Sequence, residues 1–404
     1  MKNLLTFALC AAVAGSMYGQ ADAVKSASKL SGKLDKLSEA RTLIKGAMDN
    51  EQTKNQAETY FTAGKIEFDA FDKGFQAKAI NPNDPSADPV AMADQLMNGY
   101  NYFLKALPLD SLPNEKGQVK PKFSSKILSA IQGHASDFFT AGASYFNDKK
   151  YYPEAYEAFM VYGNLPESGL MGKSAALLDS AQIATSFFNA GLSAYSGNEV
   201  EKSGNAFHKA IEYGYPEKEA YIYEIASWQA LAQRDSTKEN YAQDRIMDVA
   251  SLGYQKFGTK EPLFLNNMIN SLVSRGQYDR ALQEVNRLVT ENPDNGDILG
   301  LRAFINDRMD KDDAAVEDYR KAATLPEVGF ETLRNASKKI LLVGTSKYNE
   351  LDGAEPEKRQ AIKENYYIAA KNIAEKADQM NPGDPDLQNV IESIQYALDT
   401  YFNH

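Results

Sequence analysis

The chain has 404 residues, of which 43% are hydrophobic and 25% charged, so it contains enough apolar material for a sizeable core. Its 44 basic and 55 acidic residues give a net charge of −11, which argues against nucleic acid or an anionic lipid surface as the main partner. A single cysteine excludes a disulfide framework, and three histidines leave little for a zinc site or a histidine-based triad.

The amino terminus has the pattern of an export signal. Lys2 is followed by a short, uncharged, apolar run that ends in small residues. The run is shorter than the roughly 20 residues that span a bilayer. We expect cleavage between Gly19 and Ala23, which also removes the single cysteine. The sequence therefore predicts a signal peptide at 1–20 and an exported mature chain at 21–404, periplasmic or secreted.

Beyond this segment the apolar residues follow helical periods that come in pairs, typical of helix hairpins. A helix without a recognisable partner is marked by Ala40, Ile44 and Ala47. The first complete pair is marked by Tyr60, Ala63, Gly64, Gly99, Phe103 and Ala106. Two proline-containing stretches, near 80–91 and 108–123, are predicted to be surface insertions because proline disrupts helices.

Two further pairs occupy the middle of the chain. One is marked by Phe138, Gly142, Tyr145, Ala155, Phe159 and Tyr162, and the other by Phe187, Gly191, Ser203, Phe207 and Ala210. Segment 218–257 is helical in pattern, but its register stays open. Met247, Ser251 and Tyr254 suit the period, whereas Ala250, Tyr254 and Phe257 have the better chemistry.

The clearest repetition lies at 265–326. Leu265, Ile269, Ala281, Val285 and Leu288 are followed, 34 residues later, by Leu299, Ala303, Ala315, Tyr319 and Ala322. A small residue such as Ala281 lets antiparallel helices approach closely, and Pro293 or Pro326 stops the second helix.

A last hairpin and one final helix follow. The hairpin has a long first helix around Ile340–Tyr348 and a second helix marked by Ala370, Ala374, Ala377 and Pro382. After Pro385, one helix face contains Leu387, Ile391, Ile394 and Leu398. We expect this face to cover the end of the stack.

This spacing, with its Gly, Tyr, Ala and Pro positions, resembles the tetratricopeptide repeat over most of 33–384. The resemblance implies an all-α fold, a single right-handed α-solenoid of roughly six to seven hairpins with a carboxy-terminal capping helix. The stretch with Thr53-Lys54-Asn55, Tyr60 and Gly64-Lys65-Ile66 is similar to exported repeat proteins of Bacteroidota-type bacteria. That second resemblance implies a Gram-negative envelope.

The sequence contains no hydrolase, phosphate-binding or metalloprotease motif, and we predict no catalytic residue, metal site or cofactor. His134 and His208 are interpreted as polar structural residues, and His404 ends the chain. The densest carboxylate cluster contains Asp307, Asp310, Asp312 and Asp313. It lacks the loop of a calcium site, so we expect Asp312 and Asp313 to favour the positive end of a helix.

In the resembled family the first helices line a concave groove through set positions. Those positions predict the partner-binding residues Phe61, Lys65, Phe68, Phe139, Phe146, Phe188, Tyr195, Asn266 and Asn270, with Phe304 and Asp307 in the next repeat. Aromatic residues seven apart on one helix face suit an extended peptide, a hydrophobic helix or a sugar chain. The alternative is that the rings pack between neighbouring repeats. The basic residues with which some family members hold acidic tails are missing.

Together these patterns predict an exported, non-catalytic scaffold that binds a protein or peptide partner in its groove. A glycan- or nutrient-binding module of the cell envelope is the alternative. An all-α hydrolase is less favoured, although two suitably placed carboxylates would suffice for a glycosidase. The sequence predicts no nucleic-acid partner and no membrane insertion, and it leaves self-association open.

Overall fold

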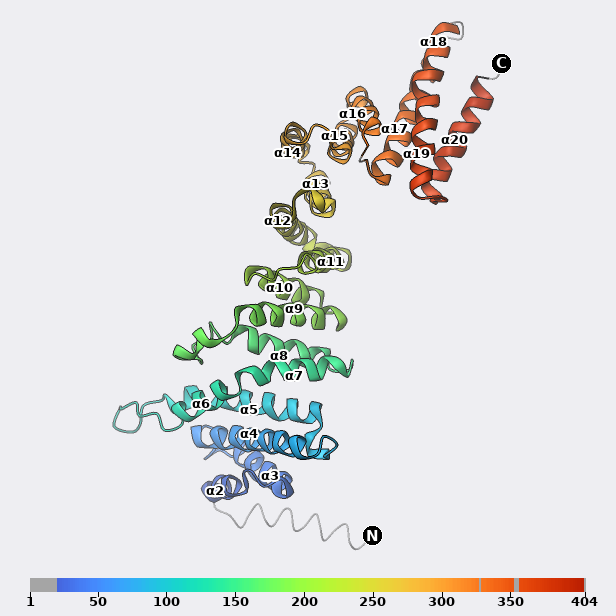
Figure 1. Ribbon diagram of the computed structural model, residues 1–404. Helices are drawn as coiled ribbons and strands as arrows, with labels where there is room; N and C mark the ends of the chain where they lie inside the picture. Colours follow the sequence, from blue (N-terminus) through green and yellow to red (C-terminus); the bar gives the residue numbers. More distant parts are fainter. Residues whose placement is uncertain (1–19, 327, 352–355, 403–404) are drawn as a thin grey trace. The chain divides into compact units, whose positions relative to one another are not determined.

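The computed structural model describes residues 20–326, 328–351 and 356–402, and these residues form helices without any strand (Figure 1). The chain divides into two compact units, residues 1–242 and 243–404, and each is described by itself. The predicted signal segment up to residue 19 and His404 lie outside the described residues.

The first unit is a stack of antiparallel helix pairs. Its helices are α2 (Gln20–Leu30), α3 (Leu37–Met48), α4 (Ala57–Ile80), α5 (Pro89–Asp110), α6 (Ser124–Gly133), α7 (Ala135–Asn147), α8 (Tyr152–Asn164), α9 (Ser180–Ser196), α10 (Val200–Glu212), α11 (Glu219–Arg234) and the start of α12 (Glu239–Phe257). From α7 to α11 each helix packs on the next, so that neighbouring hairpins share one continuous core.

Close contacts between a glycine and a ring fix the geometry of these hairpins. A Cβ atom on Gly142 of α7 would lie 2.7 Å from the ring of Phe159 on α8. Gly191 of α9 has the same relation, also 2.7 Å, to Phe207 on α10. Both rings are buried, so each glycine provides the space that its partner helix fills. The pairing predicted from the sequence is confirmed at both positions.

Helix α2 is the partner that the sequence analysis did not find for the helix at 37–48. Val24 and Ala27 are buried and join one cluster with Ala40, Ile44 and Ala47 of α3. The pattern of α2 is short and directly follows the predicted signal segment, so its apolar face is difficult to recognise from the sequence.

The two predicted insertions differ in their packing. Residues 81–88 connect α4 to α5, and Ala87 within them is buried. Pro108 lies in the last turn of α5, so the second loop begins only at Ser111. All residues from Ser111 to Lys122 are exposed.

The buried face of the second helix in segment 218–257 contains Ala242, Ile246, Val249 and Ala250, of which only Ala250 belongs to either of the two sets. The segment forms α11 and α12, and Ala250 is fully buried, whereas Met247 and Ser251 are half-buried. The set with Ala250, Tyr254 and Phe257 therefore contains the one fully buried residue of the two sets.

The second unit contains the remaining hairpins. Its helices are the rest of α12, α13 (Pro262–Ser274), α14 (Tyr278–Glu291), α15 (Gly296–Arg308), α16 (Asp312–Thr324), α17 (Phe330–Asn349), α18 (Pro356–Ile362), α19 (Ala369–Met380) and α20 (Pro385–Tyr401). A π-helical segment, Lys363–Ile368, joins α18 to α19. The predicted core residues Ala281, Val285 and Leu288 are all fully buried.

Helix α20 covers α19 as predicted. Leu387 and Ile394 are buried, and Ile391 and Leu398 pack half-buried against the same cluster. Each unit is thus an α-solenoid segment of stacked hairpins. The handedness of the solenoid and its continuity across the two units remain predictions.

Candidate functional site

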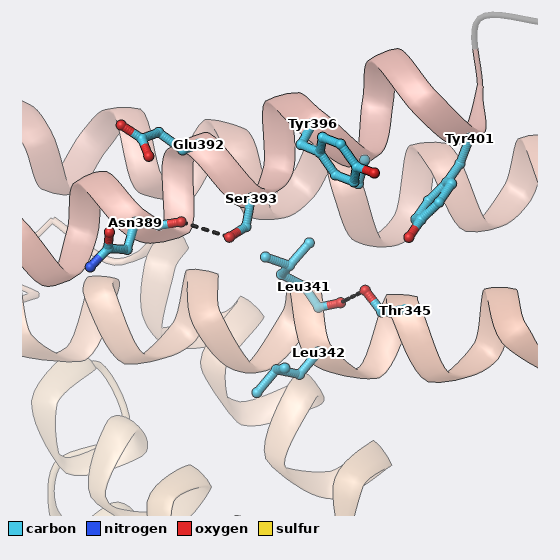
Figure 2. Close-up of a pocket in the computed structure, with 9 residues that line it drawn as sticks. Leu341, Leu342, Thr345, Asn389, Glu392, Ser393, Tyr396 and Tyr401 are labelled. Atoms are coloured by element: carbon cyan, nitrogen blue, oxygen red, sulfur yellow. Dashed lines mark hydrogen bonds between the residues drawn. The ribbon is translucent and has the colours of Figure 1, made fainter.

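A hollow of about 520 Å³ lies between α17 and α20, and we call it the α17–α20 groove (Figure 2). Helix α17 contributes Leu341, Leu342 and Thr345, and α20 contributes Asn389, Glu392, Ser393, Tyr396, Ala397 and Tyr401. Because Ser393 and Ala397 are small, the space between the two helices stays open. Figure 2 shows the polar side chains of α20 on one side and the leucines of α17 on the other.

The start of α17 is held by a carboxylate from the preceding hairpin. Asp297 of α15 accepts hydrogen bonds from the Gly329 N–H, at 2.8 Å, and from the Thr332 hydroxyl, at 2.7 Å. Further along α17, Lys339 pairs with Asp307 of α15 and with Asp312 of α16, the latter at 2.7 Å. Burial lowers the pKa of Lys339, but these two carboxylates outweigh it and the net shift is upward. Helix α17 is therefore fixed along its length.

Hydrogen bonds orient the polar floor of the groove. The Thr345 hydroxyl donates to the Leu341 carbonyl oxygen at 3.0 Å. The Tyr367 hydroxyl, from the π-helical segment beneath, donates to Thr345 Oγ1 at 3.2 Å. Burial of the Tyr367 ring raises its pKa, so this hydroxyl stays a donor at neutral pH.

An aromatic cluster closes one end of the groove. The rings of Tyr348 and Tyr401 stack with centroids 4.7 Å apart and planes at 15°. Phe402 packs edge-on against Tyr348 and against Tyr367, with centroids at 5.3 and 5.0 Å. These contacts attach the end of α20 to the hairpin before it.

Two large apolar side chains stay uncovered at the mouth of the groove. Leu342 is 56% exposed and Tyr396 is 65% exposed. Single exposed apolar residues are ordinary on a protein surface, but two that flank one hollow indicate an interaction surface. Glu392 is the charged residue among the residues that line the groove.

The aromatic residues predicted to line an amino-terminal groove take part in packing between helices. Phe68 is buried, with its ring centroid 4.9 Å from that of Phe103. Phe61 is half-buried and stacks on Phe123 at 4.7 Å. Their position seven residues apart put them on one helix face, and α5 and the loop before α6 cover that face.

The rings of the next two repeats behave alike. Phe139 packs edge-on against Phe159 at 5.4 Å, and Phe146 against Tyr152 at 5.5 Å. Phe188 stacks on Tyr215 at 4.3 Å with planes at 7°. These three half-buried rings therefore contribute to packing between helices.

The remaining predicted residues are more accessible. Lys65 pairs with Asp69 one turn later on α4. Tyr195 is 42% exposed and lies 6.1 Å from Tyr223, centroid to centroid. Asn266 and Asn270 are exposed on α13. Lys65 and Tyr195 belong to the first unit, and Asn266 and Asn270 to the second.

The carboxylate cluster that follows α15 serves the packing of α17. Asp312 and Asp313 were expected to precede and cap the second helix, but they lie inside the first turn of α16, and no side chain caps that helix. Besides Asp307 and Asp312, Asp313 pairs with a lysine of α17, Lys347, at 3.3 Å. Within the described residues no group of His, Cys, Asp and Glu has the arrangement of a metal site.

Both internal histidines contact carboxylates. His134 Nδ1 lies 2.9 Å from Asp137, and His208 Nδ1 lies 3.1 Å from the buried Glu224. Glu224 also accepts a hydrogen bond from the indole of Trp228 at 3.1 Å. The side chains of His134 and His208 are 18% and 20% exposed, which agrees with the predicted structural role.

The sequence contains a signal for the groove, namely apolar residues that cannot face the core of their own hairpin. Four apolar residues stand in a row at 340–343, and a helix cannot turn all four to the same core. Tyr396 likewise lies off the face defined by Leu387, Ile391, Ile394 and Leu398. In the described part of the chain, no helix is long and apolar enough to cross a bilayer.

No protein-family model and no curated protein matches the chain. Among solved structures, the tetratricopeptide domain of P58(IPK) has a TM-score of 0.28 at 13% identity, over 95% of this chain and 99% of the other. Yeast Tom70 has a TM-score of 0.29 at 14% identity, over 94% of this chain and 88% of the Tom70 chain. The TPR2AB domain of yeast Sti1, solved in a complex with pHSP90, has a TM-score of 0.23 at 11% sequence identity. The match covers 82% of this chain and 98% of the Sti1 chain.

All three TM-scores lie below 0.5. The repeated helix hairpins are evident from the chain's own helix packing. The paired contacts of Gly142 with Phe159 and of Gly191 with Phe207 occupy corresponding positions in two successive hairpins. The same packing of a glycine against a ring is thus repeated from one helix hairpin to the next.

Proposed function

We propose that this chain is an exported, non-catalytic scaffold of the cell envelope that binds a protein partner through the α17–α20 groove. The observation that supports binding is the pair Leu342 and Tyr396, which stay exposed on either side of a preformed hollow. Because both helices are already fixed, a partner segment would be ordered on a rigid surface at a low entropic cost.

Export is proposed from the amino-terminal pattern, in which Lys2 precedes a short apolar run. The Gram-negative envelope is proposed from the resemblance at 53–66. Fractionation of the native cell, with detection of the processed chain in the envelope fraction, tests both.

The binding test captures partners from native envelope extract on the mature chain and on a Leu342→Ser/Tyr396→Ser variant. We expect one protein that the parent retains and the variant loses, and that binds the purified parent in a titration. The matched control is Leu263→Ser/Met380→Ser, two exposed apolar residues of the same unit that lie outside the groove. Equal capture by both groove-intact and groove-altered chains would contradict the proposal.

The second candidate is a glycan-binding module. It is favoured by one observation, the exposed ring of Tyr396 beside the amide of Asn389 and the carboxylate of Glu392. An exposed ring with polar neighbours suits a sugar as well as a peptide. Calorimetric titration with envelope oligosaccharides tests this candidate. Heat of binding with the parent chain that is lost in Tyr396→Ser would support it.

A further inference from the structure

The wall of the α17–α20 groove that α20 forms contains one charged residue, Glu392, on a helix whose charged residues are all acidic. Helix α20 contains Asp386, Glu392 and Asp399 and no lysine, arginine or histidine. Asp386 lies 3.9 Å from the guanidinium of Arg334, and Asp399 accepts hydrogen bonds from Gln395. Within the described residues, Glu392 forms no ion pair and no hydrogen bond through its side chain. The carboxylate that faces the hollow is therefore the one without a local partner.

The opposite wall presents two leucines of α17 beside the Thr345 hydroxyl. Leu341 and Leu342 of α17 and Glu392 of α20 line the same hollow, and Ala397 follows Glu392 by slightly more than one helical turn. An occupant thus meets aliphatic surface on one side and an unpaired negative charge on the other. A carboxylate beside apolar surface is satisfied best by a Lys or Arg side chain, whose stem is apolar and whose head is charged.

The length of the lined surface sets the size of the occupant. The lining residues of α20 run from Asn389 to Tyr401, which corresponds to about 18 Å of helix. That length matches about three turns of a partner helix, which would present apolar side chains at helical spacing to Leu342 and Tyr396. The aromatic cluster of Tyr348 and Tyr401 limits the groove at its far end.

From this arrangement we infer that the α17–α20 groove binds an amphipathic helical segment of a partner protein, apolar on one face and flanked by Lys or Arg. This inference rests on the proposed scaffold function and adds the chemistry of the partner. It agrees with the net charge of −11, which draws basic partners toward the chain and repels acidic ones. The exposed Lys338, one turn before Leu342 on α17, is outside the lining, and no ion pair joins it to Glu392.

The test measures fluorescence anisotropy of labelled peptides with the full mature chain. The first probe is an amphipathic peptide of leucine and lysine, about three to four turns long. The second replaces its lysines by glutamate, and the third replaces its leucines by serine. Measurements at about 0.05 and 0.3 M NaCl separate the charge contribution, since screening weakens exposed ion pairs.

We expect the leucine–lysine peptide to bind, and to bind more weakly at the higher salt. The affinity for this peptide should fall at least about tenfold in Glu392→Lys and in Leu342→Ser/Tyr396→Ser. A tenfold fall is what we expect when one desolvated contact with the peptide is lost. The affinity should stay within about twofold in two control variants of the same unit, Glu375→Lys and Leu263→Ser/Met380→Ser. Glu375 is an exposed residue of α19 outside the groove, so its variant makes the same change in net charge. Matching circular dichroism spectra and melting temperatures ensure that all variants are folded.

Several results would overturn the inference. These are equal or tighter binding of the glutamate peptide, equal loss in the control variants, or no binding of the leucine–lysine peptide. Sedimentation velocity adds a fourth, a dimer of the parent that Leu342→Ser/Tyr396→Ser dissociates, since a second copy would then cover the groove. If the basic peptide fails while the groove variant still loses a captured envelope protein, the partner chemistry is wrong and the scaffold function stands. If the peptide binds but nothing is captured, the scaffold function fails and the groove chemistry stands.

Discussion

Arg302 and Asp318 form a two-pronged ion pair that joins the two helices of one hairpin, α15 and α16. The guanidinium donates from Nε to Oδ2 at 2.8 Å and from Nη2 to Oδ1 at 2.6 Å. The Asp318 side chain is only 8% exposed, and Asn306 also donates to it, at 3.4 Å. The hydrogen bonds to Asp318 raise the pKa of Arg302. A hairpin of the second unit is therefore held by charge as well as by apolar contacts.

We predict that Asp318→Ala destabilises the second unit by about 3 kcal/mol, because it leaves the guanidinium and the Asn306 amide without their acceptor. Urea unfolding monitored by circular dichroism measures the change. The control is Glu291→Ala, which removes the exposed pair with Arg287 and should cost about 0.5 kcal/mol or less. Equal costs for the two variants would contradict the prediction.

The glycine contact on α9 predicts the effect of a single methyl group. Gly191→Ala places a Cβ within 2.7 Å of the Phe207 ring, so we expect a loss of about 1–3 kcal/mol of unfolding free energy. Gly46→Ala on α3 is the matched control, because no atom lies within 4 Å of its added Cβ. That change should stabilise by about 0.5–1 kcal/mol through helix propensity. Melting curves of both variants would contradict the packing if Gly191→Ala were neutral.

Asp110 predicts a dependence of stability on pH. Burial raises the pKa of this carboxyl, but hydrogen bonds from the Lys122, Phe123 and Ser124 N–H groups and the Ser124 hydroxyl outweigh it, and the net shift is downward. A carboxyl whose pKa is lower in the folded state adds stability above its unfolded pKa, about 3.9, and that stability is lost as the pH falls through the folded pKa.

Asp110→Asn should therefore be less stable than the parent at neutral pH, and the difference should shrink below about pH 4. Urea unfolding of both chains between about pH 3 and pH 7 checks this. A difference that stays constant across the range would show that the charge of Asp110 contributes nothing.

Processing at the amino terminus should leave α2 intact. Val24 and Ala27 are buried against α3, so a cut beyond Val24 would uncover Ile44 and Ala47. We expect amino-terminal sequencing of the protein from native cells to begin between residues 20 and 23. A chain shortened to start at Ser31 should lose several kcal/mol of stability in the first hairpins, because the buried apolar area of α2 is removed. A melting temperature unchanged by this truncation would contradict the prediction.

Most of the hairpins could be predicted from the sequence because their signal is local. Ala281, Val285 and Leu288 stand at helical spacing, and a small residue, a β-branched residue and a leucine on one stripe predict one buried face. All three are fully buried. Helix α2 was missed because its buried face is short, with Val24 and Ala27, and directly follows the predicted signal segment.

The groove could not be predicted in the same way. Whether Phe68 lines a surface or a core depends on Phe103 and His134, whose rings lie within 5 Å of its own although they come from later helices. Helical spacing gives the face of one helix, but not what covers it. Leu342 and Tyr396 stay exposed because small residues of α20 leave them without a neighbour, which is a relation between two helices that lie far apart in the sequence.

The clamp made by Asp110 has a further consequence for the loop at 111–122. Both ends of this loop are held at one carboxylate, and a turn at its tip is closed by Asn114, which bonds to Gly117 and Gln118. The spacing of α5 and α6 is therefore independent of how many residues lie between them. A tag or fluorophore inserted at Gly117 should leave the solenoid unchanged, which makes this loop the natural point of attachment for labels and reporters.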